Sequence, residues 1–138
     1  MRKYVGIVTG IVKENEGTID APIGRHKNDR KKMAITLNGR NAVTHYRVIQ
    51  HYQRHTYMEF QLETGRTHQI RVHMASIHHP LLGDSVYGME DKKNKFDGQC
   101  LHAECIGFIH PRTKEYVEFH APIPEYMAQL LDTYSKGC

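Results

Sequence analysis

The chain has 138 residues, of which 39% are hydrophobic and 25% are charged, an ordinary composition for one globular domain with its own core. Lysine and arginine outnumber aspartate and glutamate by 19 to 15, so the net charge is +4 and a polyanionic partner is favoured over a basic one. No apolar run approaches the roughly 20 residues of a membrane-spanning helix, and we expect neither a signal peptide nor a membrane partner.

The three cysteines argue against an extracellular disulfide scaffold. Their number is odd and no CxxC pair is present, which also argues against a structural zinc site. We therefore expect a reducing, cytoplasmic location.

The first third of the sequence predicts short strands and one polar loop. Residues 4–12 are rich in β-branched side chains and predict a strand, and a shorter strand is expected at residues 18–20. Residues 25–32 contain no apolar side chain and predict a surface loop. The pair Asn38-Gly39 is a turn signal that follows an expected strand at residues 33–37.

The middle of the chain predicts an antiparallel strand pair followed by a helix. Residues 42–52 and 56–63 alternate between apolar and polar side chains, as half-buried strands do. Gly65 marks the turn into the helix. The apolar stripe of that helix is formed by residues at i, i+4 and i+7: Ile70, Met74 and Ile77.

Either of two threonines is expected to cap this helix. Thr64 and Thr67 both precede the apolar stripe, and a threonine hydroxyl there accepts a bond from a free backbone N–H group.

The last third predicts two strands and a closing helix. The strands are expected at residues 100–109 and 115–120, after a charged, mobile segment at residues 90–98. The helix is expected at residues 124–131, with proline at its first position. Taken together, the chain predicts a single α+β domain over residues 1–138, with a mainly antiparallel mixed sheet and few helices.

Residues 63–74 concentrate the polar chemistry of the chain, with the sequence ETGRTHQIRVHM. Arg66 lies at the helix entrance and Arg71 lies off the apolar stripe, where a fixed guanidinium group can bind phosphate or carboxylate. The alternative is a surface helix with an ordinary charged face.

This stretch and residues 78–88 resemble the signature of RluA/RluD-type RNA pseudouridine synthases, a TGRTHQIRVH-like segment followed by a HPxxGDxxYG-like segment. The resemblance implies the C-terminal portion of the catalytic domain of an isomerase that converts uridine to pseudouridine in ribosomal or transfer RNA. Such enzymes flip the uridine out, break its glycosidic bond, turn the base and rejoin it through C5. The resemblance implies no cofactor and no metal.

Two catalytic roles follow from the resemblance. Tyr4 matches the tyrosine that packs against the target base and is assigned as general base at C5, while Arg66 matches the arginine that pairs with the catalytic aspartate. Without this context, Tyr4 would be an aromatic side chain at the start of a half-buried strand. Arg66 would be an arginine bonded to backbone carbonyls at a helix start.

The expected RNA-binding residues lie in the signature and in the basic loop. They are Arg25, His26, Arg30, Lys31, Thr67, His68, Gln69 and Arg71. For the loop, the alternative is a solvated run of charge. Asp84 is expected to hold its own loop through backbone bonds. We expect structural or RNA-facing histidines at positions 73, 78 and 79, and no metal ligands there.

The catalytic aspartate of the resembling family lies in an HRLDxxTSG-like segment, and no HRLD occurs in this sequence. We therefore expect a truncated chain that is inactive alone and is complemented by an HRLD-bearing half. Open strand edges would favour self-association, particularly at residues 4–11. The alternative function is a non-catalytic RNA-binding module. A scaffold without affinity for RNA is a third interpretation, which the basic loop and the two signature arginines disfavour.

Overall fold

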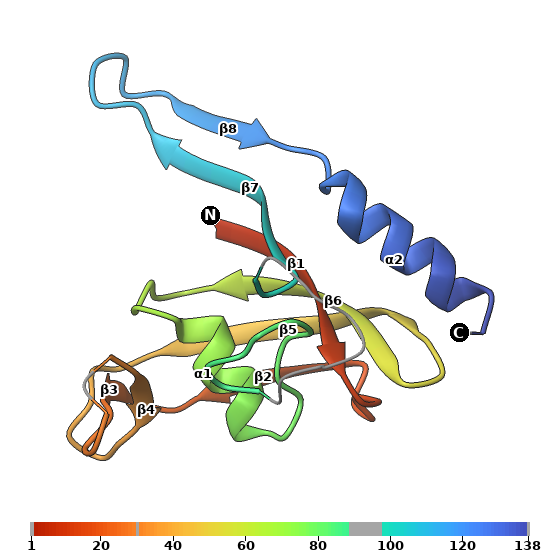
Figure 1. Ribbon diagram of the computed structural model, residues 1–138. Coiled ribbons are helices and arrows are strands. Elements are labelled where there is room, and N and C mark those ends of the chain that lie inside the picture. Colours follow the sequence, from red (N-terminus) through yellow and green to blue (C-terminus); the bar gives the residue numbers. More distant parts are fainter. Residues whose placement is uncertain (1, 30, 89–97, 138) are drawn as a thin grey trace.

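The computed structural model describes residues 2–29, 31–88 and 98–137 and contains a six-stranded sheet with a helix packed on each face (Figure 1). The sheet order is β2-β5-β6-β1-β7-β8, and each neighbouring pair runs antiparallel. This confirms the expected α+β fold with a mainly antiparallel sheet. Arg30 and most of the segment expected to be mobile lie outside the described residues.

The elements lie close to the predicted ranges. The strands are β1 (Arg2–Thr9), β2 (Glu16–Asp20), β3 (Ile23–Arg25), β4 (Met33–Ile35), β5 (Val43–His51), β6 (His55–Leu62), β7 (Leu101–Ile109) and β8 (Tyr116–His120). The helices are α1 (Gln69–Ser76) and α2 (Glu125–Ser135).

Strand β1 lies inside the sheet and pairs with β6 on one side and β7 on the other. Val5, Ile7 and Val8 of this strand are buried, because both faces of the sheet are covered at this point. The prediction that residues 4–11 form an open edge is therefore wrong. The outer strands of the described sheet are β2 and β8, and self-association through those edges stays a prediction.

Helix α1 covers one face of the sheet. Ile70 and Met74 pack against Val8, Met58 and Phe60, so the predicted apolar stripe meets the inward side chains of β1 and β6. Because this packing is extensive, most of α1 is buried rather than lying on the surface with a charged face.

Helix α2 covers the opposite face. Met127 is fully buried against Ile7, while Leu130 and Leu131 pack on the same cluster and complete the predicted apolar face. Pro124 is the N-cap rather than the first helical residue, and the helix continues four residues beyond its predicted end. Neither α1 nor α2 is long and apolar enough to cross a membrane.

The start of α1 differs from the prediction. Its N-cap is His68, whose φ of 56° places it in the left-handed region, and no side chain caps the helix. Thr64 is instead engaged elsewhere, because its hydroxyl accepts the N–H of Val43 and donates to Gln69. The threonines therefore do not cap the helix.

A small second sheet, β3-β4, lies beside α1. Val72 of α1 packs against Ile23 and Ala42, which anchors this sheet to the helix. The predicted polar loop joins β3 to β4, and within it Nδ1 of His26 accepts the N–H groups of Asn28 and Asp29.

The loop that follows α1 is fastened to the helix by a buried ion pair. Both carboxylate oxygens of Asp84 accept bonds from Arg71, at 2.9 Å from Nε and 3.0 Å from Nη2. The same carboxylate accepts the N–H groups of Val86 and Tyr87, as the sequence predicted. The Asp84 side chain is fully buried and that of Arg71 is 13% exposed, so neither charge has water as a substitute partner.

We expect Asp84→Asn to lower the free energy of unfolding by about 3–5 kcal/mol, because it leaves the Arg71 charge buried without a counter-ion. Urea denaturation measures the change. Asp132→Asn is the matched control, because its ion pair with Lys136 is more than two-thirds exposed on α2 and should contribute no more than about 0.5 kcal/mol. Equal effects of the two substitutions would contradict this account.

The same ion pair sets a pH dependence. Burial alone would raise the pKa of Asp84, but bonds from Arg71 and from the N–H groups of Tyr87 and Val86 hold that pKa below 3.8. A depressed folded-state pKa contributes stability above the unfolded value and loses it as pH falls through the folded value. The difference between wild type and Asp84→Asn should therefore shrink below pH 3.8.

Candidate functional site

Two pockets meet at Arg66. The first, here called the Tyr4 pocket, has a volume of about 260 Å³ and lies between β1 and the start of α1. It is lined by Arg2, Tyr4, Leu62, Gly65, Arg66, His68, Gln69, Ile70, Arg71, Gln99 and Leu101. The second, here called the arginine pocket, has a volume of about 480 Å³ and is lined by Ile23, Gly24, Arg25, Met33, Asn38, Gly39, Arg40, Gly65, Arg66 and Thr67.

The Tyr4 pocket combines an apolar wall with a cationic rim. Tyr4, Leu62 and Leu101 pack on the α1-side core and supply the wall. Arg2 and Arg66 belong to the rim. An apolar surface of this kind suits a flat, uncharged ring, while the guanidinium groups suit an attached or neighbouring anion.

Gln69 holds the entrance of the pocket through four hydrogen bonds. Its Oε1 accepts the hydroxyl of Thr64 at 2.7 Å and the backbone N–H of Arg66 at 3.0 Å. Its Nε2 donates to the Val43 carbonyl at 3.0 Å and to the Thr44 hydroxyl at 2.9 Å. The amide thereby uses both donors and both acceptor positions while 97% buried, which fixes the backbone at Arg66 to strand β5.

Among the described residues, one side-chain hydrogen bond orients Arg66. Its Nε donates to the Asn41 carbonyl at 2.7 Å, which agrees with the simpler sequence-based alternative of an arginine bonded to a carbonyl. A guanidinium group has five donors, so this bond also leaves capacity for an anion. Within residues 2–29, 31–88 and 98–137, no carboxylate forms an ion pair with Arg66.

Arg71 is used differently. Its fork binds the carboxylate of Asp84, which is the second of the two anion types expected for this position. The guanidinium carbon also lies 5.0 Å from the centre of the Tyr87 ring, within the range of a cation–π contact. Arg71 thus lines the Tyr4 pocket with its charge already balanced, and its direct contact with RNA stays a prediction.

Tyr87 connects this ion pair to the pocket. Its hydroxyl accepts the N–H of Met33 at 2.9 Å and lies 2.7 Å from Nδ1 of His68. Partial burial, and then the positive charge of Arg71, lower the pKa of His68 below 6.5, although Asp84 opposes the shift. The imidazole is therefore neutral near pH 7, and one shared proton joins Nδ1 of His68 to the Tyr87 hydroxyl, which also accepts the N–H of Met33.

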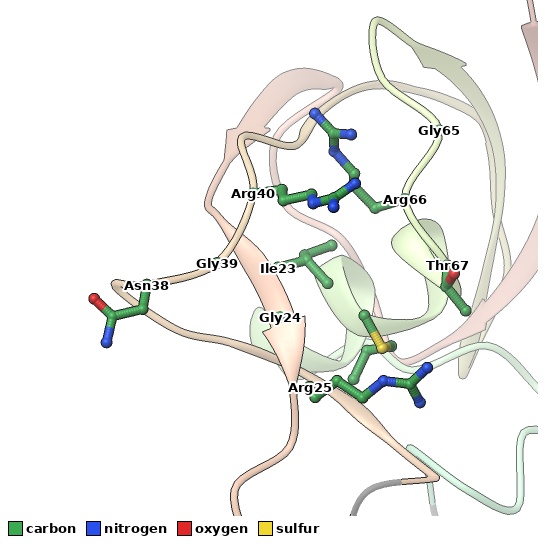
Figure 2. Close-up of a pocket in the computed structure, with 10 residues that line it drawn as sticks. Ile23, Gly24, Arg25, Asn38, Gly39, Arg40, Gly65, Arg66 and Thr67 are labelled. Atoms are coloured by element: carbon green, nitrogen blue, oxygen red, sulfur yellow. The ribbon is translucent and has the colours of Figure 1, made fainter.

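The arginine pocket gathers three cationic side chains. Figure 2 shows Arg40 and Arg66 extending on one side of Ile23, with Arg25 on the other. Arg40 is held against β3 because its N–H donates to the Ile23 carbonyl and its carbonyl accepts the Ile23 N–H. Gly39 permits this approach, since a Cβ there would lie 2.6 Å from the Ile23 carbonyl carbon.

The predicted catalytic and RNA-binding residues fall into two groups. Tyr4, His68, Gln69 and Arg71 line the Tyr4 pocket, Arg25 and Thr67 line the arginine pocket, and Arg66 lines both. Lys31 is exposed on the β3–β4 loop, where its N–H donates to Asp29. Arg40 was missed by the sequence analysis, because only the contact of Gly39 with Ile23 brings it to the pocket.

Comparisons with known proteins show the family of the chain. A family model described as RNA pseudouridylate synthase matches residues 1–76, which is more than half of the chain. The uncharacterized RNA pseudouridine synthase YlyB of Bacillus subtilis (strain 168) is 56% identical over 136 residues, covering 99% of this chain and 45% of that relative. Ribosomal large subunit pseudouridine synthase D of Escherichia coli (strain K12) is 44% identical over 143 residues, covering 95% and 44%.

The chain thus spans less than half the length of these curated relatives. Among solved structures, human RNA pseudouridylate synthase domain containing 1 superposes with a TM-score of 0.78 at 24% identity, covering 97% of this chain and 65% of that one. At this level of identity the likeness concerns the fold.

We expect Gln69→Met to lower the free energy of unfolding by about 1–3 kcal/mol, because the thioether leaves the backbone N–H of Arg66 without its partner and removes one hydrogen bond each from Thr64, Val43 and Thr44. Chemical denaturation measures the loss. Gln61→Met is the matched control, since Gln61 is exposed on β6 and its substitution should stay within about 0.5 kcal/mol. A Gln69 variant as stable as the Gln61 variant would show that the four bonds contribute little.

Proposed function

Because this chain belongs to the RNA pseudouridylate synthase family, we propose that its Tyr4 pocket receives a flipped-out uridine of RNA during isomerisation to pseudouridine. The observation that carries the proposal is that Tyr4 and Arg66, far apart in the sequence, line one pocket with an apolar wall. The reaction rearranges atoms within the nucleotide, and the proposal assigns no cofactor to it.

Tyr4 is proposed to contact the base. Extruding a uridine costs a few kcal/mol of stacking, which the pocket returns when the uracil ring packs against an aromatic side chain and apolar neighbours. Leu62 and Leu101 supply those neighbours. After the base has turned and bonded through C5, the proton on C5 leaves, and the proposed acceptor is the Tyr4 oxygen, whose own hydroxyl proton passes to solvent.

Arg66 is proposed to hold the catalytic aspartate ionised and in position. Its Nε is fixed by the Asn41 carbonyl, and no carboxylate of the described residues pairs with it, so the remaining donors are suited to an incoming aspartate. Since the sequence has no HRLD, that aspartate would come from an HRLD-bearing segment. We propose that the chain is inactive without it.

The arginine pocket and the β3–β4 loop are proposed to hold the RNA backbone beside the flipped nucleotide. Arg25 and Arg40 line that pocket with guanidinium groups of a kind that binds phosphate, and Lys31 adds an exposed charge on the β3–β4 loop. The name of the Escherichia coli relative favours ribosomal RNA of the large subunit over transfer RNA as the substrate.

A non-catalytic RNA-binding module is the second candidate function. It depends on the same two pockets, because RNA could bind to both of them without a nucleophile. The two candidates differ in what happens when the aspartate-bearing segment is supplied.

We expect release of tritium from 5-tritiated uridine in RNA only when this chain is combined with an HRLD-bearing segment of a family relative. In that mixture Arg66→Ala should lower the rate on the order of 10²–10³-fold, because the aspartate loses the charge that orients it. Arg47→Ala is the control, since Arg47 pairs with Glu59 on the exposed surface of the sheet and should leave the rate unchanged.

Two outcomes would overturn this assignment. Release by the chain alone would mean that another residue replaces the missing aspartate. No release from the combined segments, with RNA binding intact, would favour the binding module.

Lys31→Ala should reduce the salt dependence of RNA binding by about 0.7–0.9 in the log–log slope, the value for one lost phosphate contact. Filter binding over a range of salt concentrations measures it. Lys136→Ala is the matched control, because Lys136 is exposed at the C-cap of α2, pairs with Asp132 and lines neither pocket. An unchanged slope for Lys31→Ala would show that Lys31 on this loop does not contact an RNA phosphate.

A further inference from the structure

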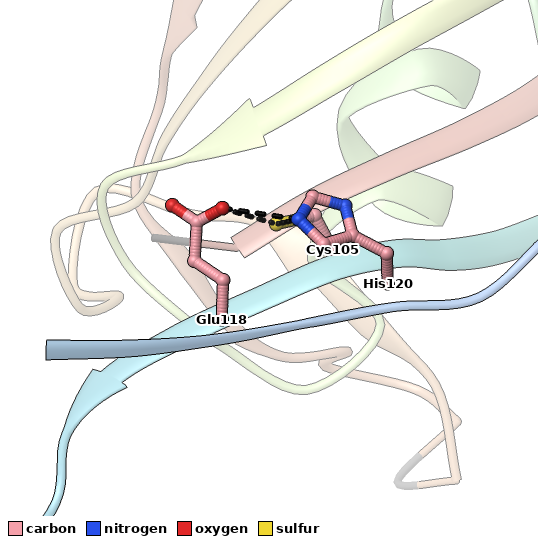
Figure 3. Close-up of side chains that lie close together, drawn as sticks. All are labelled: Cys105, Glu118 and His120. Atoms are coloured by element: carbon pink, nitrogen blue, oxygen red, sulfur yellow. Dashed lines mark hydrogen bonds and ion pairs between the residues drawn. The ribbon is translucent and has the colours of Figure 1, made fainter.

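A cysteine, a glutamate and a histidine converge on the outer hairpin of the sheet, formed by β7 and β8 (Figure 3). Cys105 is directly opposite His120 in the strand register, and Gly107 is opposite Glu118. Because alternate residues of a strand share a face, the side chains of Cys105, Glu118 and His120 project to the same side of the hairpin.

The three donor atoms are close to one another. Nε2 of His120 lies 3.0 Å from Oε1 of Glu118, and Sγ of Cys105 lies 3.9 Å from each of these atoms. In a tetrahedral zinc site, bond lengths of about 2.0–2.3 Å place the ligand atoms about 3.4–3.6 Å apart. The observed separations therefore differ from those of a zinc site by only about half an ångström.

We propose that Cys105, Glu118 and His120 form a zinc-binding site with three protein ligands. A thiolate with an imidazole is a donor set that selects zinc over magnesium or calcium, and a carboxylate completes a set of three. His120 binds through Nε2 in its neutral form, and Cys105 binds as thiolate after releasing its proton. Glu118 and His120 are exposed, so a water molecule takes the fourth position.

A second layer of contacts supports the ligands. The hydroxyl of Tyr116 hydrogen-bonds to the Glu118 carboxylate. The ring of Tyr116 reaches this position because it crosses Gly107, where any Cβ would collide with the phenol oxygen. An outer group that orients a ligating carboxylate in this way is typical of metal sites.

The burial of the cysteine also suits a metal ligand. Cys105 is 2% exposed, so its sulfur is shielded from bulk solvent while it faces the two exposed ligands on β8. The other described cysteine, Cys100, is not an alternative donor, because burial raises the pKa of its thiol to about 11 and keeps it protonated near pH 7.

The sequence predicted no metal ligands, because Cys105 is far from Glu118 and His120 along the chain. Here the pairing of β7 with β8 brings Cys105 next to Glu118 and His120. The site is separate from the Tyr4 pocket and the arginine pocket, none of whose lining residues it shares. A zinc ion there would join the outermost strand, β8, to the sheet.

The test is titration of the purified chain with Co²⁺, which gives a near-ultraviolet charge-transfer absorption when a thiolate binds it, followed by displacement with Zn²⁺. We expect one metal ion per chain. Cys105→Ser should abolish the sulfur absorption. His120→Ala and Glu118→Gln should each weaken Co²⁺ binding by more than roughly 10–100-fold, which is the effect of losing an outer-layer partner. Zn²⁺ should also raise the melting temperature of wild type but not of Cys105→Ser.

Two matched controls accompany these variants. His110→Asn removes a half-buried histidine from the turn of the same hairpin, and Cys138→Ser removes a thiol outside the described residues. Both should bind Co²⁺ as wild type does, and circular dichroism of the metal-free variants checks that each is folded. Absence of the sulfur absorption in wild type, or its survival in Cys105→Ser, would overturn the proposal.

Discussion

The buried ion pair between Arg71 and Asp84 is the contact on which the geometry of the site depends. It joins α1 to the loop that follows it, and it leaves Tyr87 where its hydroxyl reaches both His68 and the backbone of Met33. Burying two charges is costly, and a pair of apolar side chains of the same size would often be more stable. What the ion pair provides is one defined arrangement, since a carboxylate and a guanidinium fork fit together in few ways.

The two arginines of the signature show how similar residues acquire different roles. The fork of Arg71 binds both carboxylate oxygens of Asp84, whereas among the described residues the guanidinium group of Arg66 is bonded through Nε, at the junction of two pockets. Gln69 is responsible for this difference, because its buried amide fixes the backbone of Arg66 to β5. The backbone at the helix entrance is thus fixed, while the guanidinium group of Arg66 keeps donors for an anionic partner.

Local patterns in the sequence predicted the elements well, but contacts between distant segments were less accessible. The alternation around Met58 and Phe60 identified β6, and the stripe of Ile70 and Met74 identified α1, because both signals depend on near neighbours. The expected threonine caps were wrong because His68 adopts a left-handed conformation that frees Thr64 for Gln69. The roles of Arg40 and Cys105 depend on pairing with Ile23 and with β8, which no local pattern contains.

The central position of β1 has a consequence for the order in which the chain can assemble. Arg2 pairs with Ile106, so β1 cannot complete its hydrogen bonds until β7, about 100 residues further along the sequence, has been made. The β5–β6 hairpin, by contrast, closes over a short turn and is complete much earlier. Distant pairings of this kind carry a large loop-closure entropy and slow the search for the native topology. Until β7 arrives, one edge of β1 is unsatisfied, and this interval is the period of greatest exposure to misassembly.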